Sequence, residues 1–312
     1  MASGSGSIGQ ILLPRLGRAV VTLWLVLTIV FVVLRFSGDP VRLLLPSDAS
    51  EAQVAALRAD LGLDASLPVQ YLRFASEVAR GDLGNSMRFN QPALGLVLSR
   101  FPATATLALV AFAVAATLGL AIGSAAAFAR DSAWDRAAMA VMSLLQAAPS
   151  FFLGVMMILL FSVRLGWVPT SGSGTPAHVV LPALTLSALT LGSIARLTRS
   201  SLLDTLGAEY IRTARAKGIP ERVVWFRHAL RNAALPLTTM LGLELAGLLT
   251  GAVIVETVFA WPGIGRLALD SVAARDYPVV QAVVLLIAII FVVINLLVDL
   301  SYLVLDPRTR HG

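Results

Sequence analysis

Six long apolar stretches constrain the fold of this sequence more than any other feature. They cover approximately Ile11–Phe36, Ala103–Phe128, Ala137–Val163, Val179–Leu197, Leu237–Ala260 and Val279–Leu305. A helix needs about 20 mostly apolar residues to cross the hydrocarbon core of a bilayer, and it satisfies its own backbone hydrogen bonds there. The sequence therefore predicts an all-α integral membrane protein with six transmembrane helices.

The composition argues against a water-soluble globule. Hydrophobic residues make up 57% of the 312 residues and charged residues 13%, against about 45–50% and about 25% in soluble domains. No cysteine is present, which excludes disulfides and thiolate metal sites. In a membrane protein the net charge of +6 is expected to reflect loop orientation, and we expect no nucleic-acid partner.

The chain is predicted to contain a flexible lead, a first transmembrane helix, an extracytoplasmic helical region and a core domain with the other five spans. These parts are residues 1–10, 11–36, 37–100 and 101–312. Within residues 37–100, Ser50 suits a helix cap and Pro68 suits the first position of a second helix. That second helix carries an apolar stripe, expected to pack on a neighbour or on the membrane surface: Val69, Leu72 and Val78.

Arginine and lysine predict the orientation of the spans, because short cytoplasmic loops carry an excess of both. With the N-terminus inside, the cytoplasmic segments hold 14 such residues and the short external loops hold 3. The sequence therefore predicts that both termini face the cytoplasm, together with the polar loop 200–235.

Residues 208–220 form the most polar segment in the second half of the chain. Nothing before Gly218 breaks a helix, and Gly218 stands where a helix end favours left-handed backbone. Pro220 suits the first position of a following helix. We expect a helix, a glycine corner and a second helix, with a cationic face formed by Arg212, Arg215 and Lys217.

The segment Arg212–Gly218 reads Arg-Thr-Ala-Arg-Ala-Lys-Gly, and Leu235-Pro236 follows it. Here the chain resembles the permeases of ATP-binding-cassette (ABC) importers, whose EAA loop reads Glu-Ala-Ala, three residues, Gly. Arg212 replaces the Glu, as in the dipeptide/oligopeptide and nickel branch. The resemblance continues from Leu12 to the C-terminal region, on residues 61–64, 67–71, 81–84, 195–201, 227–232, 255–266 and 306–308.

This resemblance implies a type I importer permease in the bacterial inner membrane, forming half of a translocation pathway for peptides. The implied partners are a second homologous permease in a heterodimer, two ATPase subunits and an extracytoplasmic binding protein, besides the lipid bilayer. No cofactor is expected in this chain, since ATP and magnesium would belong to the ATPases. A nickel chelate or a glutathione-like peptide is the alternative cargo.

The one lysine, Lys217, lies between Ala216 and Gly218, so the chain lacks the Gly-Lys-Ser/Thr of a phosphate-binding loop. The polar segment is therefore expected to act mechanically, as a coupling helix that fits a groove in an ATPase. The expected coupling residues are Glu209, Tyr210, Arg212, Thr213, Ala214, Arg215, Ala216, Lys217 and Gly218. Ala214 and Ala216 would allow close approach. The alternative is a basic anchor on anionic lipid headgroups.

Polar side chains inside the spans are the candidates for a translocation path, because such groups are costly in hydrocarbon. They are Gln146, Glu244, Asn295 and Asp299. For Glu244 and Asn295 the favoured interpretation is that they line a water-filled path, and the alternative is structural hydrogen bonding between spans. For Asp299 and Glu256, which are nearer the span ends, a structural role is favoured. Gln146 precedes Pro149, which predicts a kink in the third span.

Small residues recur at every fourth position in two spans, which permits close helix approach. They are Ala115, Gly119, Gly123 and Ala127 in the second span, and Gly247 and Gly251 in the fifth. Packing within this chain is the favoured interpretation, and contact with a second permease is the alternative.

Two other classes of protein remain as rivals. An ion-gradient transporter would use Glu244 or Asp299 as its ion site, but the sequence lacks detectable inverted repeats. An intramembrane enzyme would need a nucleophile with a base, and the three histidines, His178, His228 and His311, lie far apart.

Overall fold

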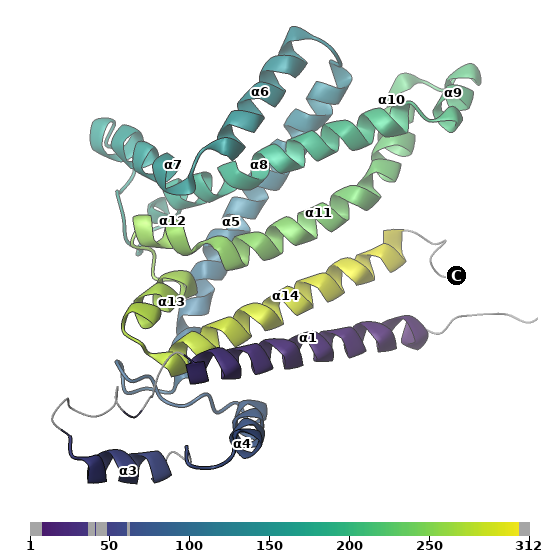
Figure 1. The fold of residues 1–312 in the computed structure, drawn as a ribbon. Helices are drawn as coiled ribbons and strands as arrows, with labels where there is room; N and C mark the ends of the chain where they lie inside the picture. The colour runs from purple at the N-terminus through teal and green to yellow at the C-terminus, as the bar shows by residue number, and fades with distance from the viewer. Residues whose placement is uncertain (1–7, 37–40, 42–48, 61–62, 306–312) are drawn as a thin grey trace, which may run out of the picture. The chain divides into compact units, whose positions relative to one another are not determined.

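A computed structural model describes residues 8–36, 41, 49–60 and 63–305 (Figure 1). Their regular elements are helices: α1 (Ile8–Phe36), α3 (Glu51–Asp60), α4 (Leu67–Ala79), α5 (Ala93–Phe128), α6 (Ala133–Ala147), α7 (Ser150–Met157), η1 (Ile158–Arg164), α8 (Ala177–Leu206), α9 (Glu209–Ala216), α10 (Glu221–Val223), η2 (Val224–Ala229), α11 (Leu230–Gly251), α12 (Val253–Val258), α13 (Ile264–Ala273) and α14 (Tyr277–Leu305). Residues 1–7 of the predicted lead and the motif at 306–308 lie outside the described residues.

Five segments are long and apolar enough to cross a membrane, and a bent pair of helices gives a sixth. The five are Leu13–Val33, Ala93–Phe128, Ala177–Leu206, Pro236–Val258 and Tyr277–Ser301. The bent pair, Ala133–Ala147 with Ser150–Arg164, turns by 102°. This is far sharper than the kink predicted at Pro149, because Ala148 leaves the helix in an extended conformation with ψ 131° and the residue before a proline disfavours helical backbone.

The chain forms two compact units. The first is built mainly from residues 103–266 and 293–305, and the second from residues 10–102 and 267–292. The candidate sites described below lie in the first unit.

Helix α8 forms the core of the first unit and lies between α6 and α11 (Figure 1). In its most apolar stretch 61% of the residues are buried, compared with 11% to 28% in the other four long spans. It also continues past Leu197, where the sequence predicted its end, to Leu206. Arg199, outside the predicted span, therefore lies within the helix.

The small residues of α5 pack against α8. A side chain at Gly119 would clash with Ile194, and one at Gly123 would clash with the carbonyl oxygen of Ala195. Ala115 is fully buried in the same contact. The predicted packing of this stripe within the chain is therefore confirmed for α5.

Gly247 in α11 is different. It is exposed, and a side chain added there would meet no atom within 4 Å. The expectation that this glycine packs within the chain is wrong, because no helix of its own unit approaches it.

A buried ion pair that the sequence analysis missed joins α6 to α8. The guanidinium of Arg199 donates two hydrogen bonds of 2.6 Å to the carboxylate of Asp135. The Asp135 side chain is only 3% exposed, so removing either partner would leave a buried charge without its counter-ion.

Glu256 is fully buried and holds the turn that follows α12. Its carboxylate accepts hydrogen bonds from the Thr104 hydroxyl at 2.6 Å and from the Arg266 backbone N–H at 2.9 Å. A side chain at Gly263 would clash with this carboxylate. The contacts agree with the structural role favoured for Glu256 over a place in a path.

In the second unit, α4 packs on α1 through aromatic side chains. The Tyr71 and Phe31 rings lie 5.3 Å apart, and the Tyr71 hydroxyl hydrogen-bonds the Thr28 hydroxyl at 2.8 Å. The predicted apolar stripe of α4 contributes little to this contact, since Val69 and Leu72 are 51% and 67% exposed. Ser50 caps α3 as predicted, because its hydroxyl accepts from the Gln53 N–H at 3.3 Å.

Asp276 fixes a loop of the second unit from a distance of about 190 residues in sequence. Its buried carboxylate accepts from the Ser86 hydroxyl at 2.5 Å and from the Met87 N–H at 3.1 Å. The sequence offers no local signal for this contact.

We predict different effects of the same substitution at two glycines. Gly123→Ala places a methyl group against the backbone of α8, and overpacking of this kind costs about 1–3 kcal/mol, so the thermal transition of the detergent-solubilised protein should fall. Gly17→Ala, on an exposed part of α1 with nothing within 4 Å, should not lower it. Equal behaviour of the two variants would contradict the close α5–α8 contact.

Candidate functional site

The predicted coupling segment is a helix, a glycine corner and a short second helix. Gly218 has φ +72°, the left-handed conformation expected of it. The Ile219 N–H donates to the Ala214 carbonyl at 3.2 Å, which closes the end of α9. Pro220 is extended, with ψ 138°, and precedes α10 instead of being its first residue, so the second helix begins one residue later than predicted.

The inner face of α9 is packed by the chain itself. Ile211 and Ala214 are buried together with Val224, and Leu206 and Ile219 cover them. Ala214 therefore cannot provide close approach to a partner, as the sequence suggested, whereas Ala216 is exposed. This small apolar cluster fixes α9 to the end of α8.

The outer face of α9 is charged but largely paired. Arg212 bonds Glu209 at 2.9 Å, and Arg215 bonds Glu221 at 2.7 Å. The Arg215 guanidinium lowers the pKa of Glu221, so this link is complete at neutral pH and is lost as the pH falls through that lowered pKa. Lys217 is exposed. Arg212, Arg215 and Lys217 are thus exposed as the predicted cationic face requires, but two of the three are paired with carboxylates.

Tyr210 connects α9 to α11. The side-chain amide of Asn232 donates to the Tyr210 hydroxyl at 3.0 Å and to the His228 carbonyl at 2.8 Å. The coupling segment is therefore attached to two long helices, α8 through its apolar cluster and α11 through this hydrogen bond.

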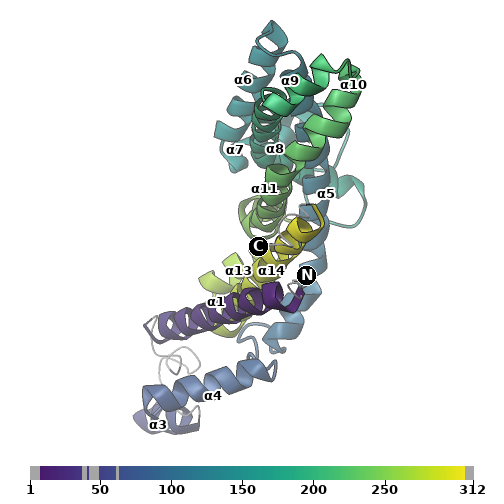
Figure 2. The same cartoon turned by 90° about the vertical axis from the view of Figure 1, so that its right-hand side faces the viewer.

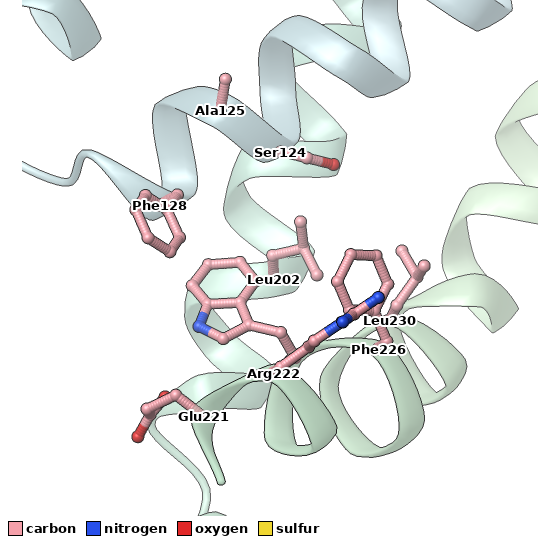
Figure 3. A pocket seen from close by; sticks show the side chains of 9 residues that line it. Ser124, Ala125, Phe128, Leu202, Glu221, Arg222, Phe226 and Leu230 are labelled. Atoms are coloured by element: carbon pink, nitrogen blue, oxygen red, sulfur yellow. The ribbon is translucent and has the colours of Figure 1, made fainter.

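An apolar groove of about 510 Å³ lies beside α10 (Figure 3). It is lined by Ser124, Ala125, Phe128, Leu202, Glu221, Arg222, Trp225, Phe226 and Leu230. The Phe128 and Trp225 rings are 5.4 Å apart, and Phe128 and Phe226 are 75% and 68% exposed. Helices α9 and α10 lie at the same end of the first unit as the turn from α5 to α6 (Figure 2).

A second polar site lies within the spans and connects α6, α8 and α11. The Gln146 amide donates to the Ser193 hydroxyl at 2.8 Å, and its carbonyl oxygen accepts from the Arg196 guanidinium. The Ser193 side chain also interacts with the Glu244 carboxylate. We call Gln146, Ser193, Arg196 and Glu244 the span network. The structure thus brings together two of the four predicted path residues.

The other two predicted path residues, Asn295 and Asp299, lie one turn apart on α14 and are half-buried. Helix α14 meets α11 where Val298 crowds Gly242. In the described part of the chain no hydrogen bond joins Asn295 to the span network. The network instead includes Arg196, which stands at the end of the predicted span Val179–Leu197 and was not among the predicted path residues.

No group of three or more histidine, cysteine or acidic side chains suited to a metal ion occurs among the described residues.

Comparison with known proteins places the chain in a family. Residues 119–311 match the family described as "Binding-protein-dependent transport system inner membrane component", and residues 8–108 match its N-terminal companion. The chain is 43% identical over 96% of its length to the glutathione transport system permease protein GsiC of Pectobacterium atrosepticum, covering 98% of that protein. It is 41% identical, with the same coverage, to GsiC of Escherichia coli K12.

The fold is also found among solved structures. The inward-facing MetNI methionine ABC transporter matches 68% of this chain and 96% of its own, with a TM-score of 0.57 and 19% identity. The resemblance of residues 212–218 to importer permeases is thereby confirmed. The chain belongs to the family of inner membrane components of binding-protein-dependent transport systems, and it is a permease subunit of an ABC importer.

Proposed function

We propose that this permease conducts short peptides of the glutathione type into the cell. It would work with a second homologous permease, two ATPase subunits that bind ATP and magnesium, and an extracytoplasmic binding protein. The observation that carries the proposal is 43% identity over nearly the whole chain to a permease named for glutathione transport. The peptide-type reading of residues 212–218 supports the same class of cargo.

The coupling segment is proposed as the ATPase contact. Its exposed residues form the docking face: Glu209, Tyr210, Arg212, Thr213, Arg215, Ala216, Lys217 and Gly218. Ala214 would support this face from within, in the cluster with Ile211 and Val224. A push on α9 would then reach α8 and α11, because the apolar cluster and the Tyr210–Asn232 hydrogen bond hold α9 to both.

This role requires that α9 and both termini face the cytoplasm. An impermeant thiol reagent should label Thr213→Cys from the cytoplasmic side alone, and labelling from the outside would reject the orientation. The absence of native cysteine makes this measurement direct.

Uptake by the reconstituted importer tests the proposed cargo. Vesicles are prepared with this chain, its partner permease and the ATPases facing the lumen, and with the binding protein outside. They should accumulate labelled glutathione when ATP is present in the lumen. Accumulation driven by a proton gradient without ATP would contradict the mechanism. Accumulation of a nickel chelate but not of the peptide would contradict the cargo.

A pair of glycine variants tests the coupling role of the corner. Gly218→Val forces a β-branched residue into left-handed backbone, φ +72°, which L side chains adopt at a cost of about 1–2 kcal/mol. We expect α9 to shift and the stimulation of ATP hydrolysis by loaded binding protein to fall at least tenfold, with normal membrane insertion.

Gly207→Ala is the matched control. Gly207 has ordinary helical backbone, φ −79°, and an added methyl group would meet atoms no closer than 3.5 Å. Its ATP hydrolysis should remain stimulated. Full stimulation of Gly218→Val, or equal loss in both variants, would show that the corner geometry does not matter for coupling.

A further inference from the structure

The span network holds two opposite charges that do not meet. Arg196 donates to Gln146 and, at 3.4 Å, to the Ser143 hydroxyl, while Glu244 interacts with Ser193. Among the described residues no carboxylate lies within ion-pair distance of Arg196. The neighbouring pair Arg199–Asp135, one turn further along α8, is by contrast directly bonded at 2.6 Å. The two arginines therefore differ: the charge of Arg199 is neutralised by Asp135 inside the bundle, whereas Arg196 is hydrogen-bonded only by neutral groups.

The network also lies on an open face of the chain. Arg196 and Gln146 are exposed, and Ser193 and Glu244 are half-buried. An exposed charge on a span does not face lipid at an acceptable cost, so it faces a water-filled cavity or another protein. Other exposed parts of the same spans are apolar and suit lipid, such as Phe151, Phe152 and Leu159 on α7 and η1.

The side of α11 next to Glu244 is open. Gly247 follows it by three residues on α11, which places the two on one side of the helix. Gly247 is exposed and nothing lies within 4 Å of its missing side chain. The Glu244 carboxylate therefore has the open position at Gly247 on one side and the chain of polar side chains to Arg196 on the other.

We infer that the span network is a contact site for a zwitterionic peptide, with Arg196 binding its carboxylate and Glu244 binding its ammonium group. A guanidinium presents a planar fork of donors that matches a carboxylate, and a carboxylate accepts from an ammonium group. Gln146 and Ser193, which lie between the two charges, both donate and accept and so match the N–H and C=O of a peptide bond. The inference deepens the proposed function and rests on it, since it assigns residues of this permease to recognition of the cargo.

Two charge-removing variants with matched cargo analogues test the site in the complete importer. Uptake of glutathione is compared with uptake of an analogue amidated at its glycine carboxylate and of an N-acetylated analogue. Arg196→Gln should reduce the preference for the free carboxylate, and Glu244→Gln the preference for the free amine, each about tenfold, the usual effect of losing one charge-assisted hydrogen bond. The preference of the binding protein itself is the same in every assembly, so it cancels when variant and wild type are compared.

Arg18→Gln is the control, because Arg18 is an exposed arginine of α1 that bonds the Pro14 carbonyl at 3.4 Å. Both preferences should stay at the wild-type value. Wild-type preferences in Arg196→Gln and Glu244→Gln would overturn the inference, and so would a uniform loss of all three cargoes, which indicates a structural role. Absence of glutathione uptake by the wild type would instead reject the proposed function.

A labelling measurement tests the site without any cargo. In the assembled importer, a charged thiol reagent should modify Ser193→Cys in the network and Ser143→Cys beside it at least tenfold faster than Leu159→Cys on the apolar face. Protection of both network positions would show that they contact lipid or a partner protein and would overturn the inference even if glutathione is not the cargo.

Discussion

Helix α8 crosses its neighbours so closely that glycine is required at the crossing points. On α5 these are Gly119 and Gly123, and on α8 itself it is Gly192, where an added side chain would clash with the Met142 carbonyl oxygen of α6. Backbones in such contact cannot slide without displacing one another, because packed interiors leave no free volume. Helix α8 therefore behaves as a fixed member of the first unit. It carries the span network in its second half and continues through Gly207 into α9, so one buried helix connects the proposed cargo contact with the proposed ATPase contact.

The polar groups of the spans fall into two kinds that follow from the cost of charge in hydrocarbon. Asp135 and Glu256 are buried and have their hydrogen bonds supplied by fixed partners, Arg199 for the first and Thr104 with the Arg266 backbone for the second. These groups fix helix positions. Arg196 and Glu244 are accessible and joined only through neutral side chains, an arrangement that leaves both charges able to bind something else. The same chemistry thus supports structure in one place and, by our inference, recognition of the cargo in another.

Much of the fold could be predicted from the sequence because its signals are local. Apolar runs of sufficient length predicted the spans, the fourfold recurrence of small residues predicted the α5 contact, and Gly218 predicted the left-handed corner. What failed depends on contacts between distant residues. The continuation of α8 beyond Leu197 brings Arg199 against Asp135, 64 positions away in the sequence. Both residues lie outside the apolar runs that predicted the spans. Ala214 reads as an exposed small residue until Val224 is seen to cover it. The 102° bend after α6 follows from Pro149 only together with the packing of α7 on α8.

The central claim is that α8 and α9 move together as one rigid connection between the span network and the ATPase. The most direct test is the distance between spin labels at Leu184→Cys on α8 and Thr213→Cys on α9, two exposed positions. It is measured by pulsed electron paramagnetic resonance in the complete importer, with and without bound ATP. The account predicts one narrow distance distribution that ATP leaves unchanged, while the distance from Thr213 to a label in the partner permease shifts. A change of several ångströms between Leu184 and Thr213 would contradict it, because the joint at Gly207 would then absorb the motion.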